Sequence, residues 1–462
     1  MYFEVGKDII ARDFTSALLA WCKDNLCLRN PEYDKKERMG LWCGNIPREI
    51  QLYERDGDDI ILPFGCVARL RKLFPECRFV SRISAIQSFF YDSSINLYGY
   101  QEKAVLAALE ARNGVVVMPC GAGKTQTALE LISRIGGKAL WLTHTSDLLN
   151  QSLNRAKSVL GADNLSYGTI TGGKVNIGSG ITFATVQTMS KLDLAKYRDV
   201  WDVVIVDECH KAIGGPTKVM QFYKVLSNLS CRYKFGLTAT PKRADGLQGA
   251  MFALIGDIVY EVSREAVKDT TCPVTLMPIE TQYMPNFDVV LAGDGTLNYA
   301  NLTTDLIENK ERFDLVANVI DLNYQKGAML VLANRVDYIS RLQKEFKGRS
   351  VCLSTMGASK KAKEMRKEVL RKLNDGEIDC VFATYQLAKE GLDVPNLRTL
   401  VLATPEKDET TVMQSIGRVA RKFEGKGYGT VIDFVDVNFA MYNGWYKKRK
   451  GIYKKLDVVC DL

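Results

Sequence analysis

Two short stretches of the chain carry the residue types that bind and hydrolyse a nucleotide. The first reads MPCGAGKT over residues 118–125, after an apolar β-branched run and before a helical pattern. Glycines at such a strand–loop–helix junction let main-chain N–H groups and the helix N-terminus face phosphate oxygens. The usual pattern has a glycine where this chain has Met118, but that position is the end of the strand, before the loop bends. We therefore expect a phosphate-binding loop that holds ATP.

The second stretch, VIVDECH, is an apolar strand that ends in the adjacent acids Asp207 and Glu208. In the predicted site, Lys124 neutralises the β- and γ-phosphates and the Thr125 hydroxyl holds Mg²⁺. Asp207 reaches the same Mg²⁺ through water, and Glu208 polarises the attacking water as general base. His210 is predicted to couple hydrolysis to motion, and a capping or core histidine is the alternative.

The composition indicates an ordinary globular chain. It has 462 residues, 46% hydrophobic and 25% charged, a length that favours about three domains. No apolar run reaches the roughly 18 residues of a membrane helix, and the N-terminus lacks a signal peptide's apolar core. We therefore expect a soluble, cytoplasmic protein with no membrane partner. Twelve cysteines without a C-x-x-C pair, and only two histidines, argue against a structural zinc site.

The charge distribution points mildly to a polyanionic partner. The net charge is +8, and basic residues gather in residues 64–82 and in the C-terminal run WYKKRKGIYKK, residues 445–455. The first cluster suggests a contact with duplex or branched DNA, and a packing domain with a basic rim is the alternative. The second interleaves aromatic rings with cations, which suits phosphates and stacked bases. A solvated terminal helix explains the second cluster equally well.

The pattern of apolar runs predicts an α/β protein. Residues 1–92 read as a small α+β accessory domain, a possible DNA-binding domain. Two series of near-continuous apolar strands alternate with helices over residues 93–262 and 311–462, which is typical of parallel sheets covered on both faces. Residues 263–310 are expected to connect the two. Within them, residues 288–300 suggest a hairpin that separates strands, with a plain linker as the alternative.

The DECH stretch resembles the DExH box of superfamily 2 helicases, and the other motifs of that family follow in order. Residues 97–101 resemble the motif with the upstream glutamine, 143–151 motif Ia, 185–188 motif Ib/Ic, 236–241 motif III, 383–384 with 390–395 motif V, and 414–421 motif VI. The MPCG, LTATPKRADG and DFVD stretches look like the XPB and UvsW-type branch, which includes phage-type DNA helicases. The resemblance covers roughly residues 97–440, and the first ~90 residues match no family.

The resemblance implies two RecA-like domains in tandem that use ATP and Mg²⁺, and it assigns roles to particular residues. The implied ATP-binding residues are Gln101, Gly121, Ala122, Gly123, Lys124, Thr125, Gly391 and Asp393, with Thr125 and Asp207 on the metal. The implied catalytic residues are Lys124, Glu208, Gln414, Arg418 and Arg421, and the coupling residues are His210, Thr238 and Thr240. The implied nucleic-acid contacts are Thr143, Thr145, Thr185, Asn334, Arg335 and Thr384. Small polar residues at strand ends suit phosphate contacts, although they also serve as turn or cap residues.

The predicted function is an ATP-dependent DNA helicase or translocase with 3′ to 5′ polarity. It would act as a monomer on duplex or branched DNA in repair, recombination or replication. An RNA helicase is a second hypothesis, because the DECH and TAT motifs fit it too. A motor subunit of a restriction system is a third, but no nuclease pattern stands outside the motor. A non-catalytic clamp is a fourth, but Lys124, Glu208 and Arg421 are all present.

Overall fold

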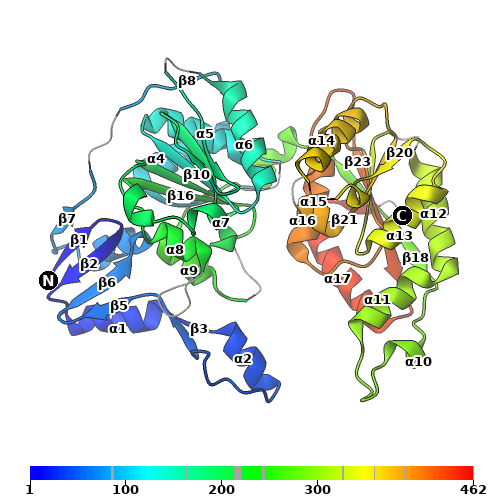
Figure 1. Cartoon of the computed structure of the whole chain (residues 1–462), viewed down its shortest axis with the longest axis horizontal. Helices are drawn as coiled ribbons and strands as arrows, with labels where there is room; N and C mark the ends of the chain where they lie inside the picture. Colours follow the sequence, from blue (N-terminus) through cyan, green and yellow to red (C-terminus); the bar gives the residue numbers. More distant parts are fainter. Residues whose placement is uncertain are drawn as a thin grey trace. The chain divides into compact units, whose positions relative to one another are not determined.

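The computed structural model describes residues 1–84, 88–119, 121–161, 164–212, 220–241, 245–324, 327–357, 359–389, 392 and 394–460. These residues form two compact units, Met1–Val267 and Lys268–Leu462 (Figure 1). Each unit is described by itself.

The first unit is built on an eight-stranded sheet. In spatial order its strands are β13 (Lys174–Asn176), β12 (Gly168–Thr171), β14 (Ile181–Thr185), β10 (Ala139–Thr143), β15 (Val203–Asp207), β16 (Tyr233–Thr238), β9 (Asn113–Val117) and β17 (Ile258–Glu261). All neighbouring pairs are parallel except β12 with β13. Every residue of β9, β10, β14 and β15 is buried, as expected for strands covered on both faces.

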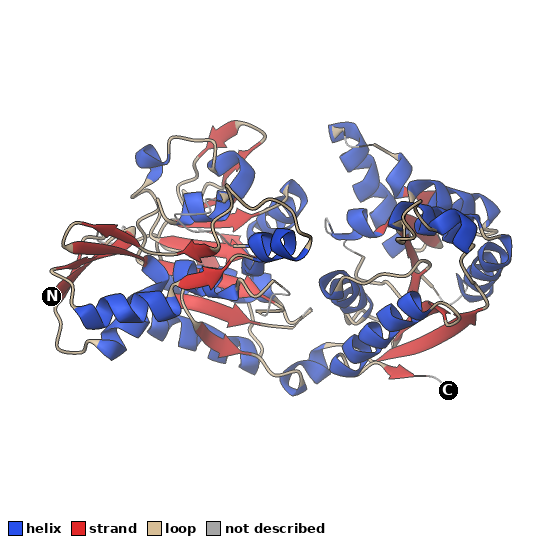
Figure 2. Cartoon of the chain, turned by 90° about the horizontal axis from the view of Figure 1, so that it is seen from below, coloured by secondary structure: helices blue, strands red, loops and turns tan. Residues whose placement is uncertain are grey.

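Helices cover both faces of this sheet (Figure 2). One face carries α4 (Gly99–Ala111), α5 (Lys124–Ile135) and α6 (Ser146–Val159), and the other carries α7 (Val186–Met189), α8 (Gln221–Leu226) and α9 (Gln248–Ile255). Each layer has its own apolar core against the sheet. No helix among the described residues of either unit is long and apolar enough to cross a bilayer.

The N-terminal part of the first unit is a smaller α+β layer, as the sequence predicts. Its five strands are, in spatial order, β5 (Glu54–Asp56), β6 (Asp59–Pro63), β2 (Asp8–Arg12), β1 (Tyr2–Val5) and β7 (Phe79–Ser81). It also holds α1 (Ser16–Asn25), the one-turn helix η1 (Phe64–Cys66), α3 (Val67–Leu73), and the pair β3 (Cys27–Arg29) and β4 (Glu49–Gln51) around α2 (Pro31–Arg38). Buried residues alternate along β2, so one face of the small sheet forms a core.

This accessory layer is packed onto α9 of the large sheet (Figure 1). Its core includes Leu247, Ala250 and Ala253 beside its own apolar residues. A Cβ atom at Gly65 would lie 2.4 Å from the carbonyl oxygen of Phe252, so only glycine permits this approach. The two layers therefore share one core.

The N-terminal basic cluster is used largely inside this unit. Arg69 pairs with Asp257 of the large sheet layer, with Nε 2.8 Å from a carboxylate oxygen. Arg71 lies over the Phe79 ring at 4.7 Å. Arg82 donates a hydrogen bond of 2.8 Å to Glu4. Three cations of this cluster thus have partners within the unit, in acids or rings from other segments of the chain.

The second unit is built on a seven-stranded parallel sheet. Its strands are, in spatial order, β20 (Ser350–Cys352), β21 (Cys380–Thr384), β19 (Met329–Ala333), β22 (Thr399–Leu402), β23 (Gly429–Asp436), β18 (Val274–Thr281) and β24 (Val459–Cys460). The strand β18 pairs with β23 at eight positions, although it lies in the segment predicted to connect the domains. Strands inside a parallel sheet usually have a continuous apolar sequence, whereas polar residues and Pro278 interrupt that of β18, so the sequence did not indicate this strand.

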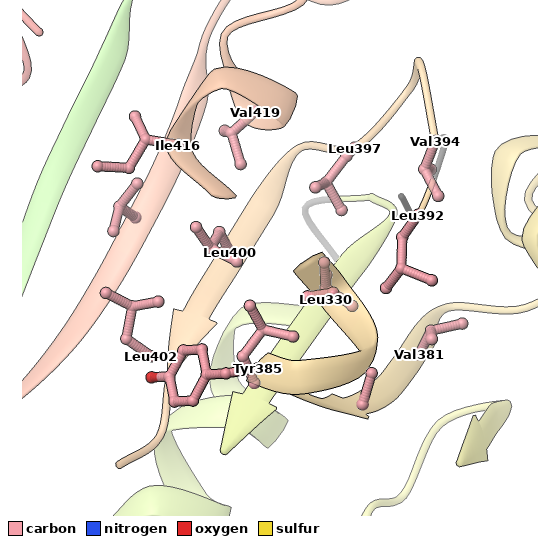
Figure 3. Close-up of a cluster of buried hydrophobic side chains, with 14 of the residues drawn as sticks. Leu330, Val381, Tyr385, Leu392, Val394, Leu397, Leu400, Leu402, Ile416 and Val419 are labelled. Carbon is pink, nitrogen blue, oxygen red and sulfur yellow. The ribbon is translucent and has the colours of Figure 1, made fainter. Parts of the chain in front are cut away.

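Two layers of helices enclose this second sheet. One contains α14 (Lys360–Asn374), α15 (Tyr385–Lys389), α16 (Glu409–Val419) and α17 (Ala440–Lys455), and the other contains α11 (Tyr299–Glu308), α12 (Lys310–Asn323) and α13 (Val336–Glu345). Figure 3 shows part of the first core, where Ile416 and Val419 of α16 lie over Leu400 of β22.

The predicted hairpin region begins with the short helix α10 (Phe287–Val290). A turn follows, in which the side chain of Asp294 accepts a hydrogen bond of 3.0 Å from the Thr296 amide. Val290 and Leu302 pack with Tyr442 of α17 in a small core of their own. The segment is thus a folded part of the second unit.

Replacing Gly65 by alanine tests the shared core of the first unit. The added Cβ would collide with the main chain of α9, and overpacking of this kind costs about 1–3 kcal/mol. We expect the free energy of unfolding of the first unit, measured in urea, to fall by a corresponding amount. The matched control is Gly99→Ala, where nothing lies within 4 Å of the added atom. Equal stability of the two variants would contradict the packing described.

Candidate active site

The phosphate-binding loop joins β9 to α5. Gly121 and Gly123 have φ angles of 84° and 78°, in the left-handed region that glycine adopts without strain. Gly123 is also the N-cap of α5, and Lys124 is its first residue. A Cβ atom at Gly123 would lie 2.3 Å from the Gln101 side chain. The loop therefore has the glycine-dependent cradle shape that a phosphate chain requires, above the N-terminus of a twelve-residue helix.

Gln101 supports this loop through hydrogen bonds. Its Nε2 donates to the Ala122 carbonyl at 3.0 Å, and its Oε1 accepts from the Tyr98 amide at 2.9 Å. The Tyr100 hydroxyl donates to the same Ala122 carbonyl at 3.3 Å. The side chain of Gln101 is buried, with 1% exposed. The residue predicted to bind ATP thus supports the phosphate-binding loop, a role that its spacing did not reveal.

Asp207 and Glu208 end β15 beside this loop. Glu208 has a φ of 50°, an uncommon left-handed conformation for a side chain of its size, and its amide bonds the Asp207 carboxylate at 3.0 Å. Burial, followed by the neighbouring Glu208, raises the pKa of Asp207. Burial also acts to raise the pKa of Glu208, but His210 and the positive charge of Lys124 outweigh it and lower that pKa. Glu208 is therefore held as a carboxylate.

His210 connects Glu208 to the next strand. Its Nδ1 lies 3.3 Å from Oε2 of Glu208 and 3.1 Å from Oγ1 of Thr238. The Thr238 hydroxyl donates to the Thr240 carbonyl at 3.0 Å and accepts from the Thr240 amide at 3.1 Å. Since that hydroxyl proton is used, His210 Nδ1 is the donor to Thr238. The structure brings the three predicted coupling residues together with Glu208.

The predicted nucleic-acid contacts of the first unit lie at the carboxyl ends of β10 and β14. Thr143 and Thr185 are paired across these strands. The Thr143 hydroxyl donates to the Thr145 carbonyl at 3.0 Å, while Thr145 caps α6 by accepting from the Leu148 amide at 3.3 Å. Thr185 bonds the Thr188 hydroxyl at 3.0 Å. Their hydroxyls thus serve as turn and cap groups here, the alternative considered from sequence, at the edge where the active site lies.

His144 belongs to the same constellation and was not predicted. Its imidazole is in contact with the Lys211 ammonium group, which lies 3.3 Å from Nδ1, and its carbonyl accepts from Gln187 at 2.7 Å. Burial, and then the Lys211 charge, lower the pKa of His144 to about 4. A neutral His144 therefore joins the ends of β10 and α7 to the residue after the DECH box. The signal in the sequence was a second histidine beside a predicted contact residue.

In the second unit, the predicted contact residues also cluster at the carboxyl edge of the sheet. The Asn334 amide donates to Thr404 Oγ1 at 3.0 Å, and its side chain donates to the Pro405 carbonyl at 3.0 Å. Arg335 is exposed and donates to the Thr304 hydroxyl at 3.3 Å. The Thr384 hydroxyl accepts from the Leu387 amide at 3.3 Å and so caps α15.

The motif of α16 has one buried and one partly exposed arginine. Arg418 donates from Nε to the Leu392 carbonyl at 2.9 Å and from Nη2 to the Ala388 carbonyl at 2.7 Å. It therefore ties α16 to the segment of motif V. Arg421 follows the helix and Gln414 lies within it, both partly exposed. Gly391 and Asp393, predicted to bind ATP, lie outside the described residues.

Two protein-family models match the chain. Residues 94–243 match the model described as type III restriction enzyme, res subunit, and residues 311–423 match the helicase conserved C-terminal domain. The first match lies in the first unit and includes the DECH box. The second match lies in the second unit and includes α16. The chain belongs to the superfamily 2 helicases. It is therefore an enzyme with ATP-dependent helicase activity, built from two helicase domains in tandem.

The relatives of this helicase are distant and carry different names. A putative ATP-dependent RNA helicase, L396 of Acanthamoeba polyphaga mimivirus, is 23% identical over 77% of this chain and 66% of its own length. The DNA 3'-5' translocase XPB2 of Sulfurisphaera tokodaii is 25% identical over 71% of this chain and 79% of its own. The ATP-dependent DNA helicase uvsW of Enterobacteria phage T4 is 23% identical over 87% of this chain and 84% of its own.

A solved structure shares the fold. The type ISP restriction-modification enzyme LlaBIII, solved bound to DNA, matches 83% of this helicase and 32% of its own chain with a TM-score of 0.55 and 14% identity. At this identity the match speaks for the fold alone.

Replacing Gln101 by alanine tests its hold on the phosphate-binding loop. The substitution removes the bonds to Ala122 and Tyr98, worth about 1–2 kcal/mol, so we expect the KM for ATP to rise about tenfold. Steady-state ATP hydrolysis measures it. Glu102→Ala is the control, because Glu102 lies on the same helix but pairs with Arg134. A KM equal to that of the control would contradict this role.

The buried imidazole of His144 predicts a pH dependence of stability. Its pKa is lowered from 6.5 to about 4 on folding, so between these values the unfolded chain binds a proton that the folded chain does not. The free energy of unfolding should fall as the pH drops through this range. His144→Gln keeps an acceptor for Lys211 and does not titrate, so its fall should be smaller by about 1–2 kcal/mol, allowing for partial exposure. Urea unfolding at several pH values measures both, and parallel curves would refute the prediction.

Proposed function

We propose that this helicase is an ATP-dependent DNA helicase or translocase of 3′ to 5′ polarity that remodels duplex or branched DNA. The observation that carries the proposal is the series of close polar contacts from Glu208 to His210, at 3.3 Å, and from His210 to Thr238, at 3.1 Å. It links the predicted general base to the strand end next to the phosphate-binding loop. Through these contacts, hydrolysis of the nucleotide would shift residues at the carboxyl edge of the sheet.

The residues present fit ATP and Mg²⁺. The loop requires glycine at position 123, because a Cβ atom there would lie 2.3 Å from the Gln101 side chain that supports the loop. Among the described residues, Oε2 of Glu208 is buried and accepts no hydrogen bond, so it suits the proton of an attacking water. Thr125 and Asp207 would hold Mg²⁺, which neutralises charge on the phosphates when it is bound.

Each remaining residue of the site then has a separate task. Lys124 would bind the β- and γ-phosphates, and Gln101 would keep the loop in shape. Glu208 would accept the proton of the water. In the second unit, Gln414 would orient that water, and Arg421 would stabilise the transferring phosphoryl group. For Arg418 we propose a positioning role, because its donors are bonded to the Leu392 and Ala388 carbonyls.

A nucleic-acid strand would follow the carboxyl edges of the two sheets. Thr143, Thr145 and Thr185 would position the main chain there in the first unit, and Asn334, Arg335 and Thr384 in the second. Contacts of this kind are with phosphate and sugar and carry no sequence information.

DNA is favoured over RNA by the relatives. The match to the T4 protein named a DNA helicase extends over 87% of this chain, more than the 77% of the match to the putative RNA helicase. The protein named a DNA 3'-5' translocase supports the proposed polarity. We further propose a role in repair, recombination or replication, with branch migration as the reaction.

The proposal is tested by steady-state ATP hydrolysis at one low salt concentration. The reactions contain no nucleic acid, single-stranded DNA, duplex DNA, a four-way DNA junction or RNA. We expect DNA to stimulate hydrolysis at least tenfold, most strongly as a junction. Salt is fixed because phosphate contacts weaken steeply as it rises.

Glu208→Gln is the control for this measurement. It keeps the size of the side chain and removes the base, so stimulated hydrolysis should fall by about 10²–10⁴. Stimulation by RNA alone would overturn the DNA assignment in favour of an RNA helicase. A variant as active as the parent would overturn the assignment of the general base.

A further inference from the structure

Helix α17 of the second unit presents five exposed lysines on one side. With 3.6 residues per turn, Lys450, Lys454, Lys447, Lys455 and Lys448 follow one another around the axis within an arc of about 160°. Gly451 lies inside the same arc, and nothing lies within 4 Å of the position that its Cβ would take. We call these five residues the α17 lysine face.

The opposite side of α17 is anchored in the core. Arg449 is buried and forms two hydrogen bonds of 2.8 and 2.9 Å with Asp433 of β23. The Tyr453 hydroxyl donates to the same carboxylate at 2.6 Å, and Ile452 packs in the core beside it. Removing Arg449 or Asp433 would leave the other charge buried and unpaired, so this pair fixes the orientation of the helix. The lysine face is therefore held outward by the fold.

The lysine face has little compensating negative charge. Helix α17 contains no Asp or Glu, and Lys455 pairs with Glu409 of α16 at 2.8 Å. Lys450 lies 5.7 Å from the centroid of the Tyr446 ring.

Helix α14 differs from α17 in having its charge compensated, because its Arg371 pairs with Glu368, Asp375 and Glu377. Like charges three and four positions apart destabilise a helix, and a glycine in its interior adds about 0.5–1 kcal/mol. The stability of helix α17 therefore does not explain why it carries five exposed lysines and an interior glycine.

We infer that the α17 lysine face binds the phosphate backbone of duplex DNA, at a site separate from the motif residues at the carboxyl edges of the sheets. The inference rests on the proposed function and adds a second DNA contact to it. Ammonium groups on flexible stems bind phosphates as point charges and do not read bases. Gly451 leaves room for the backbone to approach the helix.

The structure shows that the aromatic rings of this run pack against the unit. Tyr453 is 3% exposed and lies in an apolar core, and Trp445 and Tyr446 are half-buried against the apolar clusters. The rings secure the helix, and the lysines carry the contact. The predicted effect is therefore electrostatic and independent of sequence.

The experiment measures how binding depends on salt. The full-length triple variant Lys447→Gln/Lys450→Gln/Lys454→Gln is compared with the parent by fluorescence anisotropy on a labelled duplex, without nucleotide, over a series of salt concentrations. Each lost phosphate contact lowers the slope of log Kobs against log [salt] by about 0.9, so the slope should fall by about 2–3. Glutamine has a helix propensity close to that of lysine, so α17 is kept.

A charge-matched control separates this site from net charge. Lys344, Lys347 and Lys361 are exposed lysines of the same unit outside α17, and their triple glutamine variant removes the same charge. We expect its slope to equal that of the parent, and both triple variants to keep the ATP hydrolysis seen without nucleic acid. Equal slopes for the two triple variants would overturn the lysine face while DNA stimulation of the parent still supports the proposed function. A parent that DNA neither binds nor stimulates would overturn the proposed function itself.

Discussion

The register of three neighbouring strands is the constraint on which the active site depends. Strands β15, β16 and β9 pair in parallel, with Asp207 opposite Leu237 and Thr238 opposite Val117. The Met118 amide donates to the Thr238 carbonyl at 2.9 Å, which fixes the start of the phosphate-binding loop against the TAT motif. Because all three strands end at one edge, the loop, the DECH box and the TAT motif meet there, although the loop and the TAT motif lie more than a hundred residues apart. A slip of one residue would turn each of these side chains to the other face of the sheet.

Placing two adjacent carboxylates at this edge has an electrostatic cost that the surrounding cations offset. Asp207 and Glu208 are both buried, and carboxylates taken out of water need compensating charge or hydrogen bonds. Lys124 and Lys211 supply positive charge, and His210 supplies a donor. Lys211 in turn rests against a neutral His144. The candidate nucleotide site and the ends of β10 and α7 are therefore parts of one polar network, in which a change in charge at one end affects the other.

The second unit uses buried ion pairs for a different purpose. Asp436, at the end of β23, pairs with Arg312 of α12 at 2.6 Å, and Asp433 pairs with Arg449 of α17. Both pairs are almost fully buried, so neither presents charge to a ligand. They fix helices on the two faces of the sheet, which leaves α17 free to carry charge on its outer side. The DFVD stretch thus orients two helices as well as marking the family.

The sequence by itself determined the α/β class, the two parallel sheets and the identity of the motifs. Continuous apolar runs and the spacing of glycine, lysine and acidic residues are local properties that the chain carries in any environment. What the tertiary structure decided depends on partners that are distant in the chain. The hold of Gln101 on Ala122, the contact of Lys211 with His144 and the approach of Gly65 to α9 each join separate segments. The same holds for β18, whose place between β23 and β24 is set by its pairing with β23. The burial of Arg418 and of Tyr453 also depends on remote groups, the Leu392 carbonyl and the Asp433 carboxylate, and leaves no local signal in the sequence.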